Sequence, residues 1–133
     1  MDGMAEPSKE CCIFEYLYRD ASNYKAWGKI LLSGATTDNE ITTLRGCLES
    51  GEYFVAEQVG IPAVYEELWK LSGGPTEDDH ALHEFVGMRE ATEEEIASMP
   101  LFGTWRELLL TFKSVVAWDY ALSPSCAISP LGA

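Results

Sequence analysis

Two histidines and the carboxylates around them, in the run DDHALHE at residues 78–84, are the side chains of this sequence best suited to metal chemistry. Imidazole and carboxylate groups bind borderline and hard metal ions. On a helix, His80 and His83 would share a face, but residues 82–89 are predicted to form a strand, in which positions 80 and 83 point to opposite sides. We therefore expect no metal and a solvated loop leading into a strand with an edge histidine. A small metal-dependent enzyme centred on His80, His83 and Asp79 is the second hypothesis.

The thiols show no pattern of a nucleophile or of a zinc site. The chain has four cysteines, Cys11, Cys12, Cys47 and Cys126, which form no C-x-x-C motif. No cationic neighbour along the sequence would lower the pKa of a thiol, and Cys47, next to Leu48 in a predicted helix, is typical of packing. The common hydrolase and nucleotide-binding patterns do not occur in the sequence. We expect reduced thiols, no cofactor and no enzymatic activity.

Charge is the strongest compositional signal. Among the 133 residues, 22 are acidic and 9 are lysine or arginine, a net charge of −13. Such a field repels phosphate backbones and anionic lipids, so direct binding to nucleic acid or to a membrane surface is not expected. Residues 49–95 hold thirteen acidic and two basic side chains, a net of −11, and therefore almost all of the excess.

The concentration of acid predicts an interaction surface. A predicted capping box and the helix dipole explain residues 93–95, whereas the acids at 77–79 lie in a Gly-Pro loop with no local structural role. We predict a non-enzymatic protein that docks a basic partner: a nuclease, a toxin or another nucleic-acid-binding protein. An interaction subunit whose acidity only serves solubility is the alternative. The predicted binding residues are Glu66, Glu67, Glu77, Asp78, Asp79, Glu84 and Trp27, a tryptophan on the polar side of its strand.

Hydrophobic periodicity and capping signals predict the elements that position these residues. Strands are expected at 13–18, 25–32, 53–56 and 82–89, and helices at 38–50, 63–69, after Thr92 and at 105–118. Capping boxes are expected at Thr37 with Glu40, Thr92 with Glu95 and Thr104 with Glu107. This order predicts one α+β domain at 12–122, with an antiparallel sheet of about four strands and helices packed on one face. Residues 1–11 and 123–133 are expected to be flexible, and the oligomeric state stays open.

Three phrases of the sequence carry a resemblance: FEYLYRDASNYK at 14–25, EYFVAEQ at 52–58 and DHALHEF at 79–85. Together they resemble an uncharacterised family of short bacterial proteins with no assigned function. The resemblance implies a bacterial or phage origin, where small acidic proteins act as inhibitors or immunity factors. The first ten residues lack a signal-peptide pattern, so we expect a cytoplasmic protein.

Overall fold

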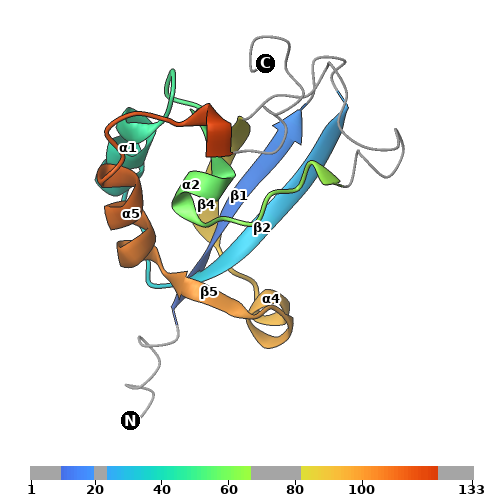
Figure 1. Ribbon diagram of the computed structural model, residues 1–133. Helices are drawn as coiled ribbons and strands as arrows, with labels where there is room; N and C mark the ends of the chain where they lie inside the picture. Colours follow the sequence, from blue (N-terminus) through green and yellow to red (C-terminus); the bar gives the residue numbers. More distant parts are fainter. Residues whose placement is uncertain (1–9, 20–23, 67–81, 123–133) are drawn as a thin grey trace.

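A computed structural model describes residues 10–19, 24–66 and 82–122 of the chain (Figure 1). A five-stranded sheet is covered by short helices. The elements in chain order are β1 (Cys11–Arg19), β2 (Lys25–Ser33), α1 (Asp38–Cys47), β3 (Tyr53–Phe54), α2 (Ala56–Val59), β4 (His83–Glu90), α4 (Glu93–Ser98), β5 (Leu101–Thr104), α5 (Trp105–Lys113) and the 3-10 turn η2 (Tyr120–Leu122). The predicted α+β class is confirmed.

The strands follow the order β3-β4-β1-β2-β5, with β1 at the centre. β1 is antiparallel to both β2 and β4, and β3 is antiparallel to β4, as the predicted sheet requires. The fifth strand was not predicted, and it runs parallel to β2, so the sheet is mixed rather than antiparallel. β5 is short and lies between Pro100 and the cap residue Thr104, and four residues give too little alternation to identify a strand.

The core lies between one face of the sheet and helices α1 and α5, which lie side by side in Figure 1. The even-numbered residues of β1 point into this core because successive strand side chains alternate between faces. The fully buried ring of Phe14 lies within 6.0 Å, centroid to centroid, of the rings of Phe54, Phe85 and Phe112. These aromatic residues therefore join β1, β3, β4 and α5 in one cluster.

The opposite face of the sheet, called the outer face below, carries α4. Glu95 of α4 bonds Lys29 of β2 and Arg89 of β4, which share a face with Glu15 and Ile13 in the strand register. The expectation that helices pack on one face only is therefore wrong for α4. An acidic helix without an apolar stripe is held here by ion pairs, and hydrophobic periodicity does not register such contacts.

The three helix starts predicted from capping residues are accurate, whereas two of these helices end earlier than predicted. Thr37 and Thr92 form complete capping boxes with Glu40 and Glu95. At Thr104 only half of the predicted box is present, because its side chain accepts the amide of Glu107 without the reciprocal bond. Helix α1 ends at Cys47, and α5 ends at Lys113 instead of residue 118.

Beyond the end of α5, the chain is held to α2 by a single glutamine. The side chain of Gln58 donates to the Ala117 carbonyl over 2.9 Å and accepts the Asp119 amide over 2.7 Å. In a continued helix, the carbonyl of Ala117 and the amide of Asp119 would bond other backbone groups. Here both bond the side chain of Gln58 instead. Val116, predicted to continue the apolar stripe of α5, is consequently fully exposed.

The chain from β3 to residue 66 also differs from the prediction. β3 ends at Phe54, and Ala56–Val59 form the unpredicted helix α2. Residues 61–64 are not helical, although a helix was predicted to start at 63. The hydroxyl of Tyr16 donates to the Pro62 carbonyl over 2.7 Å, and the Val64 amide donates to His83, so sheet side chains satisfy this backbone.

The same segment explains a glycine in β2. A Cβ atom at Gly28 would lie 2.6 Å from Cζ of Tyr16 and 2.9 Å from a methyl group of Val64. Glycine is therefore required where Tyr16 and the 61–66 segment approach the strand.

The predictions about the chain ends are tested only in part. β1 begins at Cys11, inside the stretch expected to be flexible, whereas 1–9 and 123–133 lie outside the described residues. Among the helices of the described ranges, none combines the length and the apolar character needed to cross a membrane.

Candidate functional site

Most of the predicted binding residues lie outside the described part of the chain. This holds for Glu67, Glu77, Asp78 and Asp79, and also for His80. Glu66 is described and its side chain is exposed. The proposed role of the 77–79 loop therefore stays a prediction.

Two predicted binding residues, Trp27 and Glu84, lie in one row across the sheet. Leu17 of β1 is the register partner of Trp27 in β2 and of Glu84 in β4, so all three lie side by side on the outer face. Trp27 is 64 % exposed, as its strand parity predicts. Glu84 is ion-paired, with 2.9 Å between its Oε2 and Nε of Arg19, so it is not an uncompensated charge.

The expected edge histidine is instead a core residue. His83 is fully buried, and its ring centroid lies 5.3–6.1 Å from those of Tyr16, Tyr18, Phe54 and Tyr65. Its Nε2 accepts the Val64 amide over 3.1 Å, so the lone pair of that nitrogen is used. The metal hypothesis therefore gains no support from His83. Across the described residues, no cluster of three histidine, cysteine or acidic side chains is arranged to hold a metal ion.

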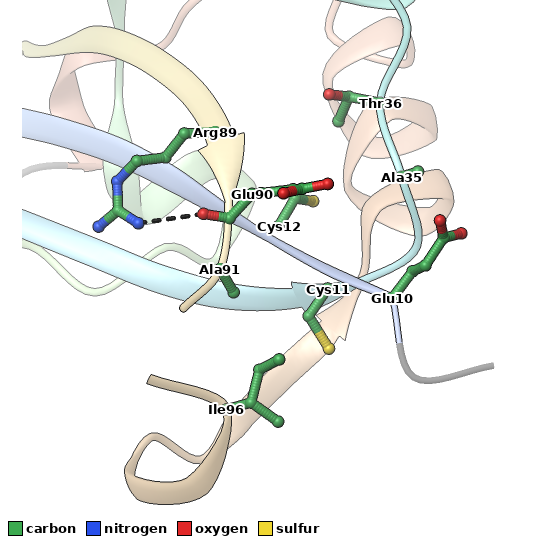
Figure 2. A pocket seen from close by; sticks show the side chains of 9 residues that line it. All are labelled: Glu10, Cys11, Cys12, Ala35, Thr36, Arg89, Glu90, Ala91 and Ile96. Atoms are coloured by element: carbon green, nitrogen blue, oxygen red, sulfur yellow. Dashed lines mark hydrogen bonds between the residues drawn. The ribbon is translucent and has the colours of Figure 1, made fainter. Parts of the chain in front are cut away.

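A cavity of about 300 Å³ lies where β1 begins and β4 ends (Figure 2). Cys11, Cys12 and Ile96 line it together with the carboxylates of Glu10 and Glu90. Burial is the main cause that raises the pKa of the Cys12 thiol to about 11, and nearby Cys11 and Glu40 raise it further. Cys12 is therefore a protonated thiol at neutral pH.

A network of ion pairs holds α4 on the outer face. The guanidinium of Arg89 donates to both carboxylate oxygens of Glu95 over 2.8 and 2.7 Å, and to Glu15 over 2.9 Å. Nζ of Lys29 donates to Glu95 over 2.8 Å, and the Thr92 amide donates over 2.9 Å. Glu95 is the one buried residue of α4. One carboxylate thus completes the capping box and anchors the helix to two strands.

This network predicts an acid-sensitive contribution to stability. Hydrogen bonds from Arg89, then Lys29 and the Thr92 amide, hold the pKa of Glu95 far below its usual range. Because the folded pKa is depressed, the contribution is complete above about pH 4.3, the ordinary value for glutamate, and is lost as the pH falls below it. Urea denaturation of Glu95→Gln between pH 2 and 5 should show a pH slope smaller by about one bound proton. Glu94→Gln, which alters an exposed neighbour, should keep the wild-type slope.

The described carboxylates of the 49–95 segment fall into separate groups. Glu84 and Glu90 lie six residues apart on β4, which corresponds to about 20 Å along a strand. Glu52 and Glu66 are also exposed, and neither belongs to the end of β4 that carries Glu90. Four carboxylates belong to the residues around that end of β4, and we call them the acidic end: Glu10 and Glu90, which line the cavity, and Glu93 and Glu94 in the first turn of α4. All four are exposed, and none forms an ion pair with another residue of the described ranges.

Exposed apolar side chains lie next to the acidic end. Ile96 of α4 is 41 % exposed, and Leu101 and Phe102 of β5 are 56 % and 40 % exposed. Only two residues separate α4 from β5, and Figure 1 shows the helix beside the start of the strand. Sequence reasoning missed these three residues. The sequence feature that could have identified Leu101 and Phe102 is the pair Leu-Phe between Pro100 and Gly103, which fits neither a helical stripe nor a strand pattern.

No protein-family model, no curated protein and no solved structure matches this chain. The resemblance to a family of short bacterial proteins therefore stays a prediction.

Proposed function

We propose that this chain is a non-enzymatic binding protein that docks a basic protein partner through the acidic end and the apolar side chains beside it. The observation that carries the proposal is a contrast in pairing. Glu15, Glu84 and Glu95 on the outer face are all ion-paired, whereas no carboxylate of the acidic end forms an ion pair within the described residues, and the nearby Arg89 is engaged by Glu15 and Glu95. Apolar groups at the centre of an interface supply affinity, and surrounding charges accelerate association.

Charge removal on the tagged full-length chain tests this function. The double variant Glu93→Gln/Glu94→Gln should reduce the association rate of a basic partner, captured from cells of the source organism, by about tenfold at low salt. High salt should abolish most of the difference, because exposed charges are screened beyond about 8 Å at 0.15 M. The association rate of wild type and variant is measured by surface plasmon resonance at two salt concentrations.

Glu52→Gln/Glu66→Gln removes the same charge at other exposed positions and serves as the matched control. Equal loss in both double variants would mean that only the total charge matters, which favours the solubility alternative. Loss confined to the control would move the site to the surface around Glu66. Denaturation midpoints of both variants check that the lost carboxylates have not unfolded α4, since acids in a first helical turn also stabilise the helix.

A further inference from the structure

Among the described strands, β5 forms one edge of the sheet. β5 pairs with β2 along Leu31–Ser33, and no strand of the described ranges covers its other side. An edge strand offers unpaired amide and carbonyl groups to any extended chain that approaches it. Proteins commonly protect such edges with lysines inside the strand, and β5 has none.

The apolar side chains of β5 make this edge suitable for pairing. Leu101 and Phe102 are adjacent and point to opposite faces of the strand, and both are exposed. An added strand would therefore find apolar contact on each face of the sheet. The opposite edge differs, because the two residues of β3 are partly or fully covered.

The charges around β5 determine which kind of extended segment can pair with its edge. Glu93 and Glu94 precede the strand, and Oε1 of Glu107 lies 3.7 Å from where a Cβ atom of Gly103 would be. Arg106, which follows the strand, lines a cavity together with Glu40 of α1, on the side of the core. A second copy would bring a further net charge of −13 and the same carboxylates to the edge, so self-association is disfavoured.

We propose that the free edge of β5 binds an extended basic segment of the partner as a sixth strand. This inference rests on the proposed function and specifies how recognition occurs. Main-chain hydrogen bonds to β5 supply affinity, and apolar side chains of the segment pack on Leu101 and Phe102. Lysine or arginine side chains of the segment lie against Glu93, Glu94 and Glu107.

A short synthetic peptide of alternating valine and lysine tests the proposal with the full chain. Titration followed by amide NMR should shift the resonances of Leu101–Thr104 and slow their hydrogen exchange. The same peptide N-methylated at its two central residues cannot donate ladder hydrogen bonds on either edge, and it should bind roughly tenfold more weakly or worse. Leu101→Ser/Phe102→Ser should weaken the unmodified peptide to a similar extent. Leu110→Ser, an exposed leucine of α5, is the control and should leave binding unchanged.

The outcomes separate this inference from the proposed function. Equal binding of both peptides, or shifts centred on Trp27, would overturn strand addition while leaving a basic partner intact. A dimer in sedimentation experiments that disappears in Leu101→Ser/Phe102→Ser would make a second copy the occupant and also overturn it. Strand addition by the peptide together with salt-insensitive capture of proteins would instead count against the proposed function.

Discussion

Phe14→Ala should lower the free energy of unfolding by about 3–5 kcal/mol, as expected when a buried phenylalanine is truncated in a packed core. The ring is fully buried at the centre of the sheet and contacts rings from β3, β4 and α5. Its loss therefore leaves a cavity shared by every layer of the core. Urea denaturation followed by tryptophan fluorescence measures the change.

Phe102→Ala removes the same atoms from the edge of the sheet and is the matched control. Phe102 is 40 % exposed, so its truncation should cost less than about 1 kcal/mol. If the two variants were equally stable, the aromatic cluster would not be the main source of stability. If Phe14→Ala fails to express, Phe14→Leu keeps most of the volume and should still be measurably less stable than wild type.

His83→Phe should destabilise the protein by about 1–3 kcal/mol although it preserves an aromatic ring at this position. The cause is the Val64 amide, which donates to Nε2 of His83 and would lose its acceptor. A buried amide left without an acceptor costs more than the hydrogen bond contributes when it is formed. Denaturation midpoints measure the loss, and the amide resonance of Val64 should show faster hydrogen exchange.

Val86→Ala provides the comparison on the same strand, because Val86 is 39 % exposed and should tolerate truncation. A His83→Phe variant as stable as wild type would show that the bond to Val64 contributes nothing. The 61–66 segment would then be held by its hydrogen bonds to Tyr16, Glu57 and Ala56 and by packing.

The sequence predicted the helix starts and the first hairpin, because residues close together in the chain determine both. The capping residues Thr37, Thr92 and Thr104 mark the helix starts because the side chain of each accepts an amide three residues later. The hairpin of β1 and β2 follows from their composition. β5 and α4 could not be placed in the same way, since β5 depends on a parallel partner about 70 residues earlier and α4 depends on ion pairs.

The structure tests only a small part of the predicted site. The basic partner predicted from the acidic composition stays a prediction, and Trp27 was correctly expected to be exposed. Composition could not tell that Glu84 is paired, because Arg19 is distant in sequence, or that Glu95 is paired, because α4 must fold back on the sheet before Arg89 and Lys29 can reach it. Nor could the alternation of β4 show that a loop residue, Val64, approaches His83 and makes it a core residue.

In helix α4, one residue fixes the helix on the sheet and the other residues form surface. Glu95 alone fastens the helix, and each of its other five residues faces solvent. Substitutions at those five positions leave the anchor and the aromatic core untouched. These positions can therefore change one residue at a time while the ion-pair network that fixes the helix on the sheet stays intact.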